Sequence, residues 1–445
     1  MTPTRFPPGP SASPLLQTLR WFYRPFTFLD SARREFGEMF SVTFVGFKTP
    51  MVMFSDPAAV KAVYTNAANG LPPGRNLVLE PLLGPRSVLL LQGREHLARR
   101  RVMLPPFHGE RMRAYEDLVR AAIDREIESW PTGEAFPIHP RMQSVTLEVI
   151  LRAVFGVADP ARLERLRDLL GRVLEQTAAP AMQLVGLATR RLGRYGPYGR
   201  FEASLARADE ELHAVISERR SDPGLEDRDD ILSALLLARF EDGEGMDDAE
   251  VRDQLMTLLL AGHETTATGL AWAFDLILRT PDVHGRLRDE VRSGDGDDYL
   301  RATVTEALRL RPVVPIAGRR LATDLEIEGQ ILEAGTDVTP AIWMTHTRED
   351  LYPEPHAFRP ERFLGDGPDT YSWIPFGGGV RRCLGAAFAE FEMRIVLEEV
   401  LRRCDLEPGA ERAESVGRRN VTLSPRGGTP VIVRSRVAPP TAVPA

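Results

Sequence analysis

The sequence predicts a mainly α-helical fold with a smaller β-sheet region, an α+β architecture in which helices dominate. Residues 111–280 carry apolar side chains at helical spacing over most of their length. Strand-like patterns are confined to short runs, which are Met39–Phe47, Met51–Phe54, Asp324–Ile331 and Val421–Val433. Because these runs come from both ends of the chain and from between them, we expect one interwoven domain.

Length and composition also predict how the chain is organised into segments. Its 445 residues, 43% of them hydrophobic, are enough to bury a large core. We predict a Pro-rich N-terminal segment over 1–20, a single domain over 21–436 and a disordered, Pro-rich tail over 437–445. The stretch Glu218–Gly224 has charge, Pro and Gly but no apolar face, so it is expected to be an exposed connector.

Charge and cysteine content exclude some classes of protein. A formal charge of -7 argues against general nucleic-acid binding. The first residues contain no apolar run that could anchor the chain in a membrane or serve as a signal, so we expect a cytoplasmic monomer. The aromatic cluster within 21–29 is expected to pack on the protein body, with lipid contact as the alternative. Two cysteines, Cys383 and Cys404, are too few for a disulfide framework, and one could be a ligand.

A glycine-rich loop places Cys383 at the start of a predicted helix over Ala386–Arg402. Free backbone N–H groups and the helix dipole stabilise a thiolate there, and Arg381 and Arg382 add positive charge. The glycines would let the backbone approach a flat macrocycle, and Phe376 could exclude water from the sulfur. A buried structural cysteine, a phosphate loop or a simple turn would each explain only one of these features.

The loop matches the pattern Phe-x-x-Gly-x-Arg-x-Cys-x-Gly in full, from Phe376 to Gly385. It resembles the haem-binding signature of the cytochrome P450 family. The resemblance implies the helical fold of that family, haem b (iron protoporphyrin IX) as cofactor, Cys383 as the iron ligand and Arg381 as the partner of a haem propionate. A thiolate ligand favours O–O bond cleavage, the chemistry of a monooxygenase.

A long helix is predicted from Asp247–Glu250, a capping-box variant, to about Leu278, before Pro281. Its apolar pattern is interrupted by Ala261-Gly262-His263-Glu264-Thr265-Thr266, a local inconsistency typical of functional sites. Gly262 would permit close approach of a cofactor beside Ala261, and the Thr265 hydroxyl could bond a carbonyl one turn back and open the helix. The segment resembles the acid–alcohol motif of the family, which implies proton delivery by Glu264 and Thr265. His263 is better explained as a core histidine than as a ligand.

Other segments resemble further elements of the family in the same order. Glu306 and Arg309 lie three residues apart on one helix face, and with Arg362 they would form a structural triad that holds the cysteine loop. His96 and Arg100, at i and i+4 and followed by Pro105-x-Phe107, would contact the haem propionates, as would Arg319. A solvated basic face is the alternative for Arg94, Arg99 and Arg101.

The resemblance therefore implies a haem-thiolate monooxygenase that inserts one oxygen atom of O2 into a lipophilic small molecule such as a fatty acid or terpenoid. The apolar pocket would be lined by Leu77–Leu91, Leu258, Ala261 and Val313–Ala317. Because the sequence shows no flavin or iron–sulfur segment, electrons would come from a ferredoxin or flavodoxin with its reductase. This partner would dock on a patch of Arg94, Arg99, Arg101 and Arg382. A haem protein that only senses or transfers electrons, a peroxide-driven or isomerising enzyme, and a helical interaction protein without cofactor are the alternatives.

Overall fold

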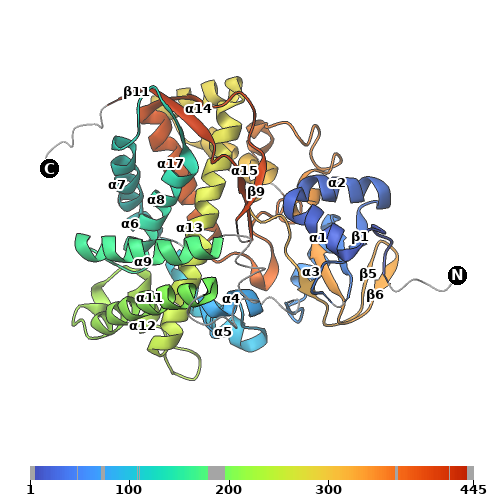
Figure 1. The fold of residues 1–445 in the computed structure, drawn as a ribbon, viewed down its shortest axis with the longest axis horizontal. Coiled ribbons are helices and arrows are strands. Elements are labelled where there is room, and N and C mark those ends of the chain that lie inside the picture. The colour runs from blue at the N-terminus through green and yellow to red at the C-terminus, as the bar shows by residue number, and fades with distance from the viewer. Residues whose placement is uncertain are drawn as a thin grey trace.

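The computed structural model describes residues 6–47, 49–71, 76–107, 109, 111–178, 196–365, 369–419 and 421–437 (Figure 1). The helices, in chain order, are α1 (Pro14–Tyr23), α2 (Pro25–Phe36), α3 (Pro57–Thr65), α4 (Asn76–Leu83), α5 (Gly93–Met103), α6 (Arg111–Ala114), α7 (Glu116–Glu128), α8 (Ile138–Ala153), α9 (Pro160–Ala178), α11 (Pro197–Arg220), α12 (Ile231–Leu237), α13 (Asp248–Leu278), α14 (Pro281–Ser293), α15 (Asp298–Leu310), α16 (Ile342–His346) and α17 (Ala386–Arg403). The mainly helical fold is confirmed.

The strands form small sheets from distant segments. They are β1 (Met39–Val42), β2 (Met51–Phe54), β3 (Ala135–Pro137), β4 (Arg319–Arg320), β5 (Leu325–Ile327), β6 (Gln330–Leu332), β7 (Asp337–Pro340), β8 (Cys404–Pro408), β9 (Val416–Arg419), β10 (Thr422–Pro425) and β11 (Pro430–Arg436). One sheet has the order β1-β2-β7-β4 and another the order β3-β11-β8, while β9–β10 and β5–β6 are hairpins. Both larger sheets join strands from far apart in the sequence, as the interwoven pattern predicts.

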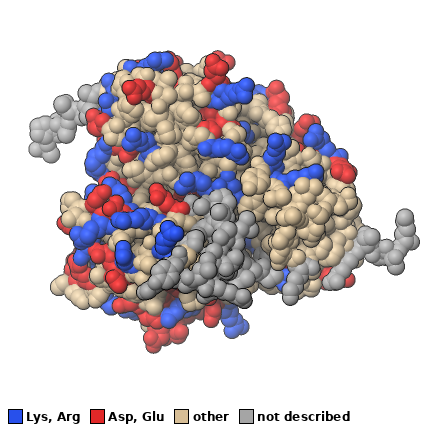
Figure 2. Space-filling model, in the orientation of Figure 1, with Lys and Arg blue, Asp and Glu red and all other residues tan. Residues whose placement is uncertain are grey.

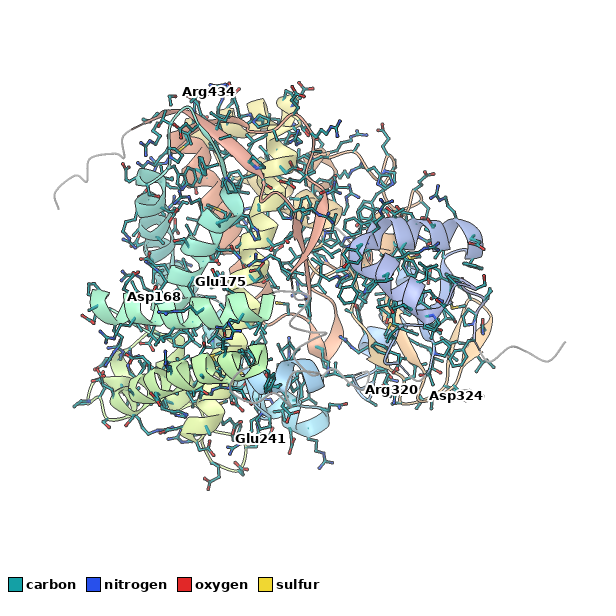
Figure 3. The ribbon with its side chains drawn as sticks, viewed as in Figure 1. Asp168, Glu175, Glu241, Arg320, Asp324 and Arg434 are labelled. Atoms are coloured by element: carbon teal, nitrogen blue, oxygen red, sulfur yellow. The ribbon has the colours of Figure 1, made fainter. Side chains whose placement is uncertain are left out.

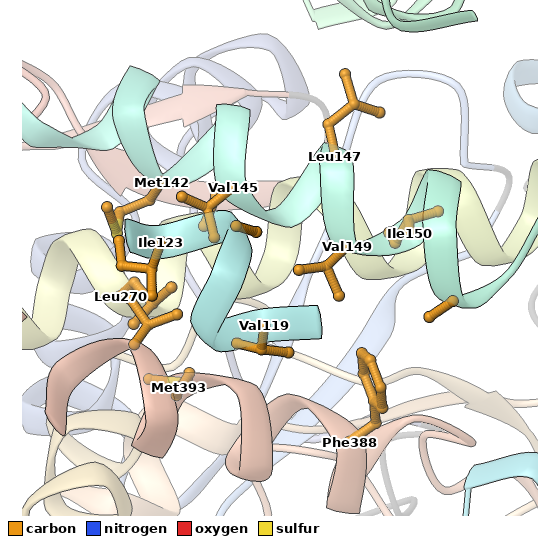
Figure 4. Packing of buried hydrophobic residues seen from close by; sticks show 14 of the residues in the cluster. Val119, Ile123, Met142, Val145, Leu147, Val149, Ile150, Leu270, Phe388 and Met393 are labelled. Carbon is orange, nitrogen blue, oxygen red and sulfur yellow. The ribbon is translucent and has the colours of Figure 1, made fainter. Parts of the chain in front are cut away.

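The helix α13 forms the axis of the helical part of the molecule (Figure 1). The carboxylate of Asp247 caps its first turn by accepting the N–H of Glu250 at 2.8 Å, and the helix ends at Leu278, as predicted. Apolar side chains of α7, α8, α13 and α17 meet in the main core (Figure 4). The helix α17 also matches its predicted range closely. Among the described residues, none of the helices has the length and apolarity required to cross a bilayer.

Three strand predictions need correction. The first strand ends at Val42 rather than Phe47, because the N–H groups of Thr43 and Val45 bond side chains of α1 instead of a neighbouring strand. Asp324–Ile331 contains the turn of a hairpin, where Glu328 and Gly329 both have positive φ. The run Val421–Val433 contributes to two strands, β10 and β11, which belong to different sheets. The strand β9, which pairs with β10, was not predicted.

The predicted connector Glu218–Gly224 is also partly wrong, because α11 continues to Arg220. Its charged residues are held by ion pairs: Arg219 is buried against Asp230, and Arg220 binds Asp248. The predicted packing of the aromatic cluster on the protein body is confirmed for Trp21, Phe28 and Leu29, which are buried, whereas Tyr23 is 68% exposed. Residues 14–20 of the predicted Pro-rich segment belong to α1, and 438–445 of the predicted tail lie outside the described residues.

A buried carboxyl on α17 makes stability depend on pH. Glu392 is 1% exposed, its Oε1 has no hydrogen-bond partner among the described residues, and burial raises its pKa from 4.5 to about 8. Between these two values the folded state keeps a proton that the unfolded chain has lost, so the free energy of unfolding falls as pH rises. We expect Glu392→Gln to remove this slope. The free energy of unfolding of the variant, minus that of the wild type, should therefore be greater at pH 8 than at pH 5 by about 2 kcal/mol or more.

Denaturant unfolding of both proteins across this range measures the difference. The exposed Glu226, which has no ion-pair partner among the described residues, supplies the control Glu226→Gln. Parallel curves for wild type and Glu392→Gln would show that the buried carboxyl does not set the pH dependence.

Candidate active site

The cysteine loop is a tight turn that ends at α17. A short 3₁₀ turn, Gly379–Arg381, precedes Cys383, whose N–H donates to the carbonyl of Phe376 at 3.0 Å. The N–H of Gly385, which is the N-cap of α17, bonds the Cys383 sulfur. The predicted position of the cysteine at a helix start is therefore confirmed.

The Cys383 side chain is deep inside the protein and yet accessible. Burial raises the pKa of its thiol, against the opposing effects of the Gly385 N–H and the nearby Arg382 and Arg100. The same side chain is exposed to a water-sized probe, whereas Cys404 is buried. A residue with both properties lines an internal space. A Cβ on Gly385 would also meet nothing within 4 Å, so this end of α17 leaves room for a bound group.

The glycines of the loop permit its approach to α3. A Cβ on Gly378 would lie 2.3 Å from the Tyr64 ring, and one on Gly379 would lie 1.8 Å from the Tyr64 carbonyl oxygen. Gly379 also has a φ of 65°, which side chains other than glycine rarely adopt. The closest surface that these glycines accommodate is thus the protein's own helix rather than a macrocycle. Phe376 packs edge-on against Trp373, with ring centroids 5.9 Å apart.

Three basic side chains, those of Arg319, Arg381 and Arg100, converge on the loop. Arg319 is buried and donates to the carbonyl of Gly378 at 3.3 Å, and Arg381 donates to that of Leu91 at 2.6 Å. Arg100 is half-buried and close enough to Cys383 for their charges to interact. Among the described residues, neither Arg100 nor Arg319 has a carboxylate within ion-pair distance. Buried cations are normally paired, so this site suits a ligand that brings carboxylates of its own.

Two further polar groups, His96 and Tyr64, complete this side of the site. His96 is buried, with Nδ1 2.9 Å from the Val88 carbonyl and Nε2 3.2 Å from that of Val380 on the cysteine loop. Burial and Arg381 lower its pKa, against the opposing effect of the two carbonyls. The hydroxyl of Tyr64 is buried and has no hydrogen-bond partner among the described residues, while Arg319 lies over its ring at 5.0 Å. A buried hydroxyl without a partner is costly unless a ligand supplies one.

The middle of α13 presents an accessible stripe. Leu258, Ala261, Gly262 and Thr265 are exposed or half-buried, although the residues around them on the same helix, apart from the half-buried Leu260, are buried. Their spacing of three and four places them on one face. The Thr265 hydroxyl donates to the carbonyl of Ala261, as predicted, but α13 runs through this segment without a break. The close approach that Gly262 permits is to Ile150 of α8, 2.9 Å from its Cβ position.

Glu264 points away from this stripe. Its carboxylate accepts the Gln143 amide at 2.7 Å and lies 3.1 Å from Arg419 Nε. Burial raises the pKa of the Glu264 carboxyl, while Arg419 and Gln143 oppose the shift. His263 is a buried core histidine whose Nδ1 lies 3.0 Å from the Thr146 hydroxyl, and burial lowers its pKa to about 4. Proton delivery by Glu264 stays a prediction, which requires either water or a side-chain movement.

The predicted triad is confirmed as a contact network. Arg309 donates to both carboxylate oxygens of Glu306 at 2.6 and 2.8 Å, and both side chains are fully buried. Arg362, in the 3₁₀ turn Pro360–Phe363, lies 3.3 Å from the same carboxylate. The carbonyl of Arg309 meets His346 Nδ1, and His346 Nε2 accepts the N–H of Ile374 just before the cysteine loop. The triad is therefore connected to that loop through His346.

Sequence reasoning missed Tyr64 and two of the partners of Glu264, Gln143 and Arg419. Each lies far along the chain from the motif that it contacts. Arg419 belongs to the basic pair Arg418-Arg419, whose pattern alone does not distinguish it from a solvated face.

Comparisons with known proteins agree with this geometry. The family model for cytochrome P450 matches residues 7–429. Putative cytochrome P450 135B1 of Mycobacterium tuberculosis (strain ATCC 25618 / H37Rv) is 40% identical over 437 residues, which cover 96% of this chain and 91% of that protein. Putative cytochrome P450 138 of the same strain is 35% identical over 435 residues, with 97% of both chains covered.

Two solved structures share the fold at low identity. A retinoic acid bound cyanobacterial CYP120A1 has a TM-score of 0.80 at 24% identity and covers 97% of this chain and 100% of its own. The haem domain of cytochrome P450DA has a TM-score of 0.84 at 22% identity and covers 98% and 100%. The chain belongs to the cytochrome P450 family. It is accordingly a haem-dependent monooxygenase, an oxidoreductase that needs O2 and a redox partner.

Proposed function

We propose that Cys383 is the thiolate ligand of a haem b, and that the enzyme hydroxylates or epoxidises a lipophilic small molecule. The observation that carries this assignment is an accessible cysteine deep in the protein, close to Arg100, which has no carboxylate within ion-pair distance among the described residues. Haem b carries two propionates, and Arg100, Arg319 and Arg381 would hold them, with His96 beside them. The orphaned Tyr64 hydroxyl would find a partner there.

The bound haem would supply the activation of dioxygen, while the residues around it would control access and protons. Apolar side chains at Leu258, Ala261 and Val313–Ala317 would exclude water and bind an apolar substrate. Leu77, at one end of the predicted pocket segment Leu77–Leu91, has a side chain outside the described residues. Thr265 is the one polar side chain of the accessible stripe, so its hydroxyl would hold a proton-bearing water, with Glu264 as the acid behind it.

The reduced carbon monoxide spectrum of the purified protein tests the assignment. A band at the position typical of thiolate ligation is expected. A band typical of a histidine ligand, or no haem uptake after supplementation, would contradict it. A panel of fatty acids, terpenoids, steroids and polyketides, screened by the spin-state shift on displacement of iron-bound water, would then identify the substrate class.

Thr265→Ala tests the role of the hydroxyl. We expect substrate binding to be retained, while the product formed per electron pair falls about tenfold or more, because a positioned proton donor contributes at least this much. Product and consumed electron donor are measured together. The control is Thr266→Ala, because Thr266 is the next residue on the helix and is buried. Equal coupling in both variants would remove Thr265 from proton delivery.

The electron donor is proposed to be a ferredoxin or flavodoxin, but the predicted docking patch needs correction. Arg99 binds Glu250 at 2.7 Å, and Arg101 binds Glu241, which lies at the outer edge of the molecule (Figure 3). Their positive charge is therefore partly neutralised within the chain. Arg382, adjacent to Cys383, and Arg94 are exposed and have no carboxylate within ion-pair distance among the described residues.

Arg382→Glu is expected to slow reduction by an acidic donor about tenfold at low salt, with the difference shrinking at high salt. Stopped-flow reduction kinetics measure this effect. Arg434→Glu, an exposed position on β11 beside Glu407, is the control. If both variants were reduced at the same rate, independently of salt, the donor would dock away from Arg382.

A further inference from the structure

The helix α1 is oriented with its apolar face outward. Its two buried side chains are Gln17 and Trp21, whereas Leu15, Leu16 and Leu19 are 59%, 41% and 44% exposed. A surface helix normally buries its leucines and exposes its glutamine. In α1 the three leucines are exposed and the glutamine is buried, which is the reverse of this rule.

Hydrogen bonds hold α1 in this orientation. The Gln17 amide donates to the carbonyls of Pro10 and Ala12 at 3.1 and 2.8 Å, and its oxygen accepts the N–H of Thr43 at 3.0 Å. The Thr18 hydroxyl accepts the N–H of Val45 at 2.9 Å. A rotation that buried the leucines would break these bonds, so their exposure is built into the fold.

The segment after β1 extends the apolar face. Val45, which is bonded to α1, is 57% exposed, and Phe47 is 38% exposed. Together with Tyr23, 68% exposed, these side chains form an apolar patch: Leu15, Leu16, Leu19, Tyr23, Val45 and Phe47. They are six of the eleven large apolar side chains that are exposed in the described part of the chain. Figure 2 shows few charged atoms on the lobe where Figure 1 places α1 and β1.

The two segments that carry the apolar patch contain charges of one sign only. Residues 1–29 and 39–54, which include every residue of the patch, contain Arg5, Arg20, Arg24 and Lys48 but no Asp or Glu. The chain as a whole carries a formal charge of -7. Arg20 and Arg24 are exposed, and neither has a carboxylate within ion-pair distance among the described residues.

We propose that the apolar patch, with Arg20 and Arg24, docks the enzyme on the surface of an anionic lipid bilayer. Exposed leucines, an interfacial tyrosine and a basic rim are the features that bind a helix in the plane of such a surface. A second copy of the chain fits less well, because a symmetric contact between patches would bring like charges together. This inference goes beyond the proposed function and does not depend on the identity of the iron ligand.

Flotation of the full-length, haem-loaded protein with vesicles tests the proposal. The protein is expected to float with phosphatidylcholine vesicles that contain about one third phosphatidylglycerol, and less with phosphatidylcholine alone or at high salt. The combined variant Leu15→Gln, Leu16→Gln and Leu19→Gln is expected to lower partitioning about tenfold or more. Arg20→Gln with Arg24→Gln should lower it about tenfold on the anionic vesicles only.

A matched pair of single variants separates the patch from general surface apolarity. Leu19→Gln should weaken binding, whereas Leu237→Gln, 38% exposed at the end of α12, should not. Thermal unfolding and the carbon monoxide spectrum of each variant should match the wild type, because these side chains are exposed. Failure of that spectrum in the wild type would refute the proposed iron ligand and leave the vesicle result unaffected.

Three results would overturn the docking proposal. They are absence of wild-type flotation, equal flotation of the triple-leucine variant, and a wild-type dimer that the same variant dissociates in sedimentation while neither protein binds vesicles. The last result would assign the apolar patch to self-association.

Discussion

Replacement of Cys383 by alanine is expected to abolish the carbon monoxide band typical of thiolate ligation, together with turnover. The Gly385 N–H and the nearby charges of Arg100 and Arg382 act on this one sulfur. Burial raises the pKa of the thiol, and coordination to iron would supply the free energy that deprotonates it. Without the sulfur, a water or a distant side chain would have to ligate the iron. The carbon monoxide spectrum would then no longer be typical of thiolate ligation.

The second cysteine provides the matched control. Cys404→Ala removes the buried thiol of β8, so the visible spectrum should stay as in the wild type. Because Cys383→Ala could lose haem altogether, haem content and the spectrum are both recorded. A Cys383→Ala protein with an unaltered spectrum and turnover would refute the assignment.

Sequence patterns predicted the long elements accurately because their signals are local. The apolar periodicity of α13 and the cap at Asp247 lie within the element itself, and Pro281 marks its end. Strand limits were less accurate, because the partners of a strand are distant in sequence. The run after Val42 has the alternation of a strand, but its N–H groups bond Gln17 and Thr18 of α1.

In the candidate site, too, residues in short local motifs were predicted, whereas pairings between distant residues were not. Motif spacing predicted Cys383, Thr265 and the Glu306–Arg309 pair, since each lies in a short pattern. The docking patch was predicted from exposed charge, and it was partly wrong because Arg99 and Arg101 find carboxylates about 150 and 140 residues further along the chain. No local pattern encodes such pairings, which only the packing of α5 near the start of α13 creates.

The same dependence on distant contacts makes the Glu306 network sensitive to single substitutions. Arg309 is fully buried and donates to the carbonyls of His346 and Pro355 at 2.7 and 2.8 Å in addition to Glu306. Its ring neighbour is Tyr352, 4.9 Å from the guanidinium. Removal of this one side chain would take its donor from each of the two carbonyls, and it would leave the buried carboxylate with only Arg362 and the N–H of Arg359.

Arg309→Ala is therefore expected to lower the free energy of unfolding by about 3 kcal/mol, a usual effect of removing one partner of a buried ion pair. Haem retention should fall with it, because the network reaches the cysteine loop through His346 and Ile374. Denaturant unfolding and the ratio of haem to protein measure the two effects. Arg301→Ala, which removes an exposed pair with Asp297 on the same helix, should cost less than about 1 kcal/mol. If Arg309→Ala were as stable as Arg301→Ala, the buried pair between Arg309 and Glu306 would not stabilise the fold, and the network would not hold the loop.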